Sequence, residues 1–120
     1  MTENQRPHCV VIGVGKGTGL ACAKKFVAEG YKVSMIARKA ERLQGFADEL
    51  EHSTAYSTDI TDTDNFRATL QQIVQEQGAP EKVIYNASLA TFGTYETLEP
   101  ADLERNFRAN TSGLLIAAQE

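Results

Sequence analysis

Short apolar segments alternate with longer amphipathic segments along this chain, and this alternation restricts the possible folds more than any other feature. Continuous apolar runs at residues 8–12, 32–37 and 82–85 are rich in β-branched residues, as expected of strands buried on both faces. Residues 54–58, the third candidate strand in chain order, give a weaker signal. Strands that alternate with helices predict a parallel sheet with right-handed crossovers and helices on both sides.

The segments between these runs carry apolar residues at helical spacing. Residues 20–27 form one stripe that ends before Gly30, and residues 41–50 form a second. In the third helix, Thr61 is the expected N-cap, with Asp64 as its capping-box partner. Its apolar stripe consists of Phe66, Leu70, Ile73 and Val74.

Pro100 opens the last predicted helix, which places Asn110 on the face that we expect to be buried. The same face carries Leu103, Phe107, Leu114 and Ala118. A buried amide without partners costs about 1–3 kcal/mol, so we expect Asn110 to be hydrogen-bonded. It serves either as a structural amide that ties the helix to a neighbouring loop or in catalysis.

Composition and charge narrow the class of protein. The chain has 120 residues, 42% hydrophobic and 23% charged, which is typical of a soluble globular domain and excludes gross disorder. We expect one domain over residues 1–120. The net charge of −4 and the lack of a basic run argue against nucleic-acid binding. No apolar run reaches the roughly 18 residues of a membrane helix, so we expect a cytoplasmic protein without a membrane partner.

Cysteine and histidine residues do not form a metal-binding pattern. Cys9 and Cys22 lack the spacing of a metal or redox pair, and we expect both to be buried thiols. His8 and His52 are isolated in the sequence. We therefore predict no metal site.

A glycine-rich turn follows the first apolar run, where a parallel sheet would bind its ligand. It departs from both the phosphate-loop pattern and G-x-G-x-x-G, but Gly13, Gly17 and Gly19 fit G-x-x-x-G-x-G. Such a turn allows close backbone approach, and the helix that starts near Thr18 would offer free N–H groups to a pyrophosphate. A simple connector is the alternative interpretation.

Two cations and no acid follow the second apolar run. Sites that prefer NAD place an acidic residue here to bind the ribose 2′-hydroxyl, whereas this chain has Arg38 and Lys39. Lys16 in the glycine turn could reach the same position. Arginine grips phosphate in a bidentate manner, so the pattern favours the 2′-phosphate of NADP over NAD. Alternatively, both cations merely begin a solvated helix.

Small polar segments follow the other two candidate strands. Asp59 and Ile60 follow the third, and Asn86, Ala87 and Ser88 follow the fourth. Small residues there would let a cofactor approach the backbone, although on spacing alone either segment could be an ordinary turn.

Taken together, these motifs make the chain resemble the first half of a short-chain dehydrogenase/reductase over residues 8–120. The family turn is T-G-x-x-x-G-x-G, with Ile12 here in place of Thr. The resemblance implies that Lys16 and Arg38 mark NADP dependence and that Asp59–Ile60 contacts adenine. It also implies that Asn86–Ala87–Ser88 replaces the family's N-A-G after the fourth strand. Asn110, with Gly113, resembles the Asn of the catalytic tetrad, which supports a proton relay.

The same resemblance implies catalytic Ser, Tyr and Lys residues, with the Lys four positions after the Tyr. None of the four tyrosines fits, because the residues four positions further on are Met35, Ile60, Leu89 and Glu99. Since family members are about twice this long, we expect a Rossmann-type, doubly wound, mostly parallel α/β fold, truncated after about four β-α units. We expect the isolated chain to lack reductase activity.

Three functions are compatible with this pattern. The first is the NADP(H)-binding portion of a short-chain oxidoreductase that acts on a small carbonyl or alcohol substrate, with homo-oligomers possible. The second is a stand-alone NADP-binding module or pseudo-enzyme that serves as a sensor or partner subunit. A flavodoxin-like or receiver domain is a third, but it would need a different phosphate loop or an acidic pair after the first strand, and residues 13–19 contain no carboxylate.

Overall fold

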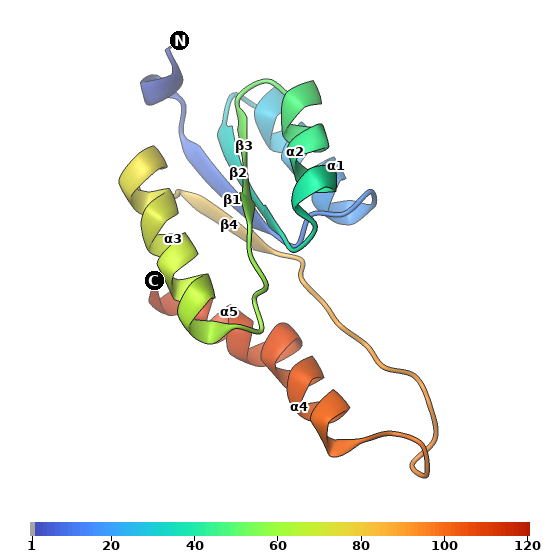
Figure 1. The fold of residues 1–120 in the computed structure, drawn as a ribbon. Helices are drawn as coiled ribbons and strands as arrows, with labels where there is room; N and C mark the ends of the chain where they lie inside the picture. The colour runs from blue at the N-terminus through green and yellow to red at the C-terminus, as the bar shows by residue number, and fades with distance from the viewer. Residues whose placement is uncertain (1) are drawn as a thin grey trace.

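A computed structural model describes residues 2–120 and contains a four-stranded parallel sheet (Figure 1). The strands are β1 (His8–Ile12), β2 (Lys32–Ala37), β3 (Ser53–Ser57) and β4 (Lys82–Tyr85), in the spatial order β3-β2-β1-β4. The predicted bounds of the first, second and fourth strands are confirmed, and β3 starts one residue earlier than expected. Because β1 lies between β2 and β4, the strand order reverses beside it.

Helices cover both faces of this sheet. In Figure 1, α1 (Thr18–Ala28) and α2 (Ala40–Glu49) lie on one face, and α3 (Thr63–Gln77) and α5 (Gly113–Gln119) lie on the other. The remaining elements are a short 3₁₀ helix η1 (Glu3–Gln5), the helix α4 (Pro100–Phe107) and the π-helical turn η2 (Arg108–Ser112). The predicted doubly wound α/β fold is therefore confirmed.

The core consists of two layers, one on each face of β1. Val10 and Ile12 pack with Phe66 of α3 and Ile116 of α5. The side chains of Cys9 and Val11 point to the opposite face of β1 from those of Val10 and Ile12. They belong to a second cluster with Ala23, Val33, Met35 and Leu43. Successive strand residues point to opposite faces, so a continuous apolar run is what a sheet covered on both sides requires.

One predicted cap and one predicted thiol environment need correction. The N-cap of α3 is Asp62, whose carboxylate accepts a hydrogen bond from the backbone N–H of Asn65, and not Thr61. Thr61 instead donates to Asp59 through its amide and its hydroxyl. Both cysteines are free, but only Cys9 is buried, since Cys22 is partly exposed on α1.

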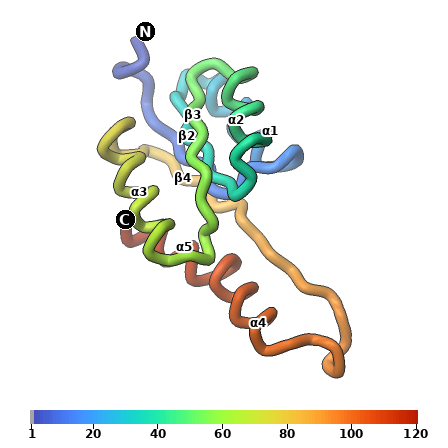
Figure 2. Tube along the Cα trace, viewed as in Figure 1, coloured from blue at the N-terminus to red at the C-terminus, as the bar shows by residue number. Residues whose placement is uncertain are grey.

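The C-terminal segment departs furthest from the compact sheet. Figure 2 shows the coil after β4 and α4 extending away from the other elements. The chain measures 56 × 27 × 21 Å, with a radius of gyration of 15.0 Å. A compact domain of this length has a radius of gyration of about 14 Å, so the extension is appreciable.

The predicted buried face of the last helix is wrong. Leu103 is 73% exposed, Phe107 is 58% exposed and Leu114 is 51% exposed. The residues that face inward are Ala109 and Ile116, together with Gly113. Leu103 and Phe107 are exposed because α4 projects beyond the sheet. Leu114 follows the π-helical turn, which advances the helical phase by about one residue, or 100°.

Candidate functional site

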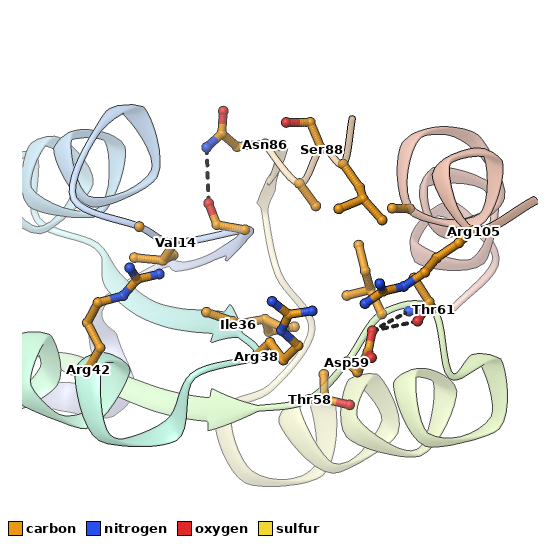
Figure 3. Close-up of a pocket in the computed structure, with 17 residues that line it drawn as sticks. Val14, Ile36, Arg38, Arg42, Thr58, Asp59, Thr61, Asn86, Ser88 and Arg105 are labelled. Atoms are coloured by element: carbon orange, nitrogen blue, oxygen red, sulfur yellow. Dashed lines mark hydrogen bonds between the residues drawn. The ribbon is translucent and has the colours of Figure 1, made fainter. Parts of the chain in front are cut away.

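A cavity of about 270 Å³ opens at the carboxyl ends of the strands (Figure 3). Its walls come from residues 13–15, 36–38, 58–61 and 86–89, with Arg42, Arg105 and Ala109. These segments follow all four strands, and the last two residues come from the C-terminal helices. Parallel α/β sheets bind their ligands in this position, so the cavity is the candidate site.

The glycine turn between β1 and α1 is packed tightly at its two ends. Gly13 has φ +95°, and a Cβ there would lie 2.5 Å from the backbone nitrogen of Ala87. A Cβ on Gly19 would collide with the carbonyl oxygen of Gly13. By contrast, a Cβ on Gly17 would meet nothing within 4 Å. Glycine is therefore required by the fold at two positions, and at Gly17 space remains open above the turn.

The N-terminus of α1 lies beside this turn and has no side-chain cap. Its N-cap is Gly17, and no side chain accepts a hydrogen bond from the first turn. Free N–H groups and the positive end of the helix dipole attract anionic groups. The turn can thus accept a phosphate at close range.

Asn86 connects the coil after β4 to the glycine turn. Its side-chain Nδ2 donates to the carbonyl oxygen of Gly13 at 3.0 Å, and its backbone N–H donates to the carbonyl of Ile12 at 2.8 Å. Ala87 and Ser88 follow it along the cavity wall. These hydrogen bonds hold two walls of the cavity together.

Asp59 lies on the opposite side of the cavity, beside the guanidinium groups of Arg38 and Arg105 (Figure 3). Its Oδ1 accepts hydrogen bonds from the Thr61 hydroxyl at 2.7 Å and the Thr61 amide at 3.0 Å. These bonds, helped by the charges of Arg105 and Arg38, lower the pKa of the Asp59 carboxyl. Asp59 is consequently a charged acceptor near neutral pH.

The cations of the cavity differ from those expected. Arg38 lines it as predicted, but Lys16 and Lys39 are exposed and are absent from its walls, as are Gly17, Thr18 and Gly19. All other predicted cofactor-binding residues line the cavity: Gly13, Asp59, Ile60, Asn86, Ala87 and Ser88.

Arg42 and Arg105 line the cavity although the sequence motifs did not single them out. Nη2 of Arg42 lies 3.7 Å from the position that a Cβ of Gly15 would occupy, so the first turn of α2 reaches the glycine turn. The four-residue spacing between Arg38 and Arg42 was the available signal. No sequence signal places Arg105, which comes from the distant α4.

Asn110 is exposed, contrary to its predicted burial, but it is hydrogen-bonded as predicted. Its Oδ1 accepts from the Leu89 backbone N–H at 2.8 Å, and its Nδ2 donates to the Leu89 carbonyl at 2.8 Å. The amide thus ties the helix to a neighbouring loop. Its catalytic role stays a prediction.

Neither a metal-binding cluster nor a membrane-spanning helix occurs among residues 2–120. Within this part of the chain, no group of three or more His, Cys, Asp or Glu side chains is arranged to hold a metal ion. No helix in the same range is both long enough and apolar enough to cross a membrane.

A parallel sheet with this strand order, a glycine turn before α1 and a cavity at the switch in strand order define a doubly wound nucleotide-binding fold. The chain belongs to the short-chain dehydrogenase family, whose sequence model matches residues 7–120.

Individual relatives show how much of the family this chain represents. It is 29% identical over 116 residues to versicolorin reductase of Emericella nidulans, covering 92% of this chain and 44% of that protein. It is 35% identical over 111 residues to serine 3-dehydrogenase of Agrobacterium fabrum, covering 88% and 43%. A short-chain dehydrogenase/reductase of Serratia marcescens superposes with a TM-score of 0.87 at 26% identity, covering 98% and 50%. The chain thus spans about half the length of the curated relatives it matches.

Proposed function

We propose that this chain is the NADP(H)-binding portion of a short-chain oxidoreductase that transfers hydride between NADP(H) and a carbonyl or alcohol substrate. One observation carries the choice of NADP: two arginine side chains line the cavity, Arg38 directly after β2, where an NAD site would carry an acid, and Arg42 in the first turn of α2. Neither guanidinium takes part in an ion pair within the described residues. Both are available for a 2′-phosphate.

The residues of the cavity and of the adjoining α1 N-terminus fit the other parts of such a dinucleotide. The open space above Gly17 and the uncapped α1 N-terminus suit the pyrophosphate. Thr18 and Gly19 begin this helix, and Lys16 precedes it as a solvent-exposed cation. Asp59 and Ile60 would hold the adenine, and the segment 86–88 would lie along the cofactor toward the nicotinamide. When bound, the nicotinamide would supply the hydride, and the protein would supply binding and orientation.

The relatives support the reaction class. Their names include 3-oxoacyl-[acyl-carrier-protein] reductase MabA of Mycobacterium tuberculosis, at 27% identity, and a serine 3-dehydrogenase, which act on a carbonyl and an alcohol respectively. A metagenomic short-chain oxidoreductase in complex with NADP superposes with a TM-score of 0.88. At 23% identity that likeness concerns the fold, so the cofactor preference is argued from Arg38 and Arg42.

A second candidate function is a stand-alone NADP-binding module or pseudo-enzyme, and the same cavity residues would serve it. The two functions share the binding site and differ in turnover. Neither function predicts that the 120-residue chain oxidises NADPH with a panel of ketones, because no Tyr-x-x-x-Lys sequence occurs in it. Such activity would require a proton donor other than the family's Tyr.

Calorimetric titration with NADP⁺ and NAD⁺ tests the cofactor assignment. We expect the unmutated chain to bind NADP⁺ at least about tenfold more tightly, because a charge-assisted arginine–phosphate contact contributes about 1.5–3 kcal/mol. R38A and R42A should each reduce this preference without changing NAD⁺ binding.

Lys39→Ala is the matched control, because Lys39 is adjacent to Arg38 but lies outside the cavity walls. Its NADP⁺ affinity should stay within about twofold of the unmutated chain, as expected for a surface charge that does not contact the ligand. Equal binding of NADP⁺ and NAD⁺ by the unmutated chain would refute the assignment.

A further inference from the structure

Tyr85, the last residue of β4, reaches across to the C-terminal helices. Its hydroxyl donates a hydrogen bond to the carbonyl oxygen of Ala109, 24 residues further along the chain. Burial raises the pKa of the Tyr85 phenol, so the hydroxyl keeps its proton and remains a donor. This is a specific polar contact between the sheet and the C-terminal segment.

The acceptor belongs to the π-helical turn η2. In this turn the N–H of Gly113 bonds to the carbonyl of Arg108, five residues back, instead of four as in an α-helix. Such a turn disturbs the regular pairing of neighbouring carbonyl groups, and the Ala109 carbonyl finds its partner in Tyr85. The hydroxyl therefore supports the turn at its irregular point.

Gly113 provides the space that this contact needs. A Cβ at this position would collide with the Tyr85 hydroxyl oxygen and approach the ring carbon that carries it to 3.1 Å. Gly113 has φ −60°, so its backbone conformation does not itself demand glycine. The requirement for glycine comes from the Tyr85 side chain.

Asn110 directly follows the anchored carbonyl. It pairs with the Leu89 backbone through two hydrogen bonds of 2.8 Å, and Leu89 and Ala109 both line the cavity. Asn110 lies inside η2, so a regular α-helical turn in its place would change the helical phase across residues 108–112. The Asn110 amide would then be displaced from Leu89.

We propose that Tyr85 is a positioning residue, whose hydroxyl holds the π-helical turn and thereby sets the Asn110 amide against Leu89 in the cavity wall. The inference concerns the geometry of the chain and holds whichever dinucleotide the cavity takes. Only the role that the Asn110 amide would have in a complete enzyme rests on the proposed function.

Four chains test the proposal by NMR: the unmutated chain, Y85F, G113A and the double variant Y85F/G113A. Tyr85→Phe removes the hydroxyl and keeps the ring. We expect the Asn110 side-chain amide signals to shift and the Leu89 amide to exchange about tenfold faster, as for a lost hydrogen bond. Amides of β1 and β2 should keep their exchange rates.

The double variant supplies the decisive comparison. G113A alone should disturb the Asn110 and Leu89 signals more than Y85F does, because its Cβ meets the hydroxyl. In the Y85F background that collision is relieved, so G113A should add less disturbance than it does alone, a non-additivity expected of residues in contact.

Three results would overturn the proposal. One is a Y85F chain whose Leu89 exchange and Asn110 signals are unchanged. Another is a G113A effect that is equally large with and without the hydroxyl. The third is a Y85F chain that does not fold, since the hydroxyl would then support the core and not the position of one turn.

Discussion

Phe66 and Phe107 are both aromatic residues of amphipathic helices, but Phe66 is 0% exposed and Phe107 is 58% exposed. Phe66 lies on α3, against the sheet, whereas Phe107 ends α4, which projects from it (Figure 1). The same pattern therefore has different consequences in the two regions, because burial depends on what the helix packs against. We distinguish a sheet region, residues 8–85, from a C-terminal region, residues 86–120.

The candidate site contains walls from both regions. Gly13, Arg38 and Asp59 are anchored by the sheet region, whereas Leu89 and Arg105 belong to the C-terminal region. In the C-terminal region, Ile116 packs into the core, and the coil at the cavity is held by the hydrogen bonds of Asn86 and Asn110. The wall formed by Gly13, Arg38 and Asp59 is consequently supported by the packing of the sheet, whereas the opposite wall also depends on a few hydrogen bonds.

The largest expected difference between the regions comes from deleting the two phenylalanines. F66A creates a cavity in the core and should lower the free energy of unfolding by about 3–5 kcal/mol. F107A should change it by less than about 0.5 kcal/mol, as for most surface substitutions. Urea denaturation measures both, and similar losses in the two variants would show that the C-terminal region is packed in solution.

A smaller effect is expected within the glycine turn. G13A places a side chain at φ +95° and against the backbone of Ala87, and should cost at least about 1–3 kcal/mol. G17A, its matched control, meets open space and should leave stability within about 0.5 kcal/mol. If G17A proves as destabilising as G13A, the space above Gly17 is not open.

The smallest predicted effect concerns pH and the buried His8 at the start of β1. Its Nδ1 donates to the Gly78 carbonyl at 2.9 Å, so the neutral ring accepts at Nε2 from the Ser34 hydroxyl at 2.7 Å. Burial lowers the pKa of His8, and the nearby Lys32 charge acts in the same direction, whereas the bond to Gly78 opposes both. The unfolded chain therefore takes up a proton more readily than the folded chain.

The stability that His8 contributes is fully present above its ordinary pKa of about 6.5, and it is lost as the pH falls from that value through the lower pKa of the folded state. We expect the free energy of unfolding to drop between pH 7.5 and 5.5 by at most about 1.4 kcal/mol per pH unit. H8Q should flatten this dependence, while H52Q, at a half-exposed histidine, should keep it. Identical slopes in all three chains would contradict the assignment to His8.

The strands were predictable because the strand preference of their residues agrees with the burial that the sheet imposes on them. The runs at His8–Ile12 and Lys32–Ala37 are mostly apolar, and the sheet buries them on both faces together with the polar residues His8, Lys32 and Ser34. Local chemistry was harder to predict where adjacent residues compete for one role. Thr61 and Asp62 are both good N-caps, and Asp62 caps α3 because Thr61 bonds to Asp59.

The site was predictable at the strand ends and less so elsewhere. Arg38 follows β2 directly, so topology places it at the cavity, whereas the reach of Lys16 or Arg42 depends on how the turn and helix are oriented. The π-helical turn has no sequence signature in a single chain. It changes the helical phase after Phe107, and this change is one reason why the buried face was predicted wrongly.

Amide hydrogen exchange with and without NADP⁺ tests the central claim most directly, namely that the dinucleotide binds at the carboxyl ends of the strands. We predict slower exchange over residues 13–19, 38–42, 58–61 and 86–89, and a smaller effect of NAD⁺ over 38–42. Residues 70–77 on the far part of α3 should be unaffected. Unchanged exchange in all four cavity segments at saturating NADP⁺ would contradict the account.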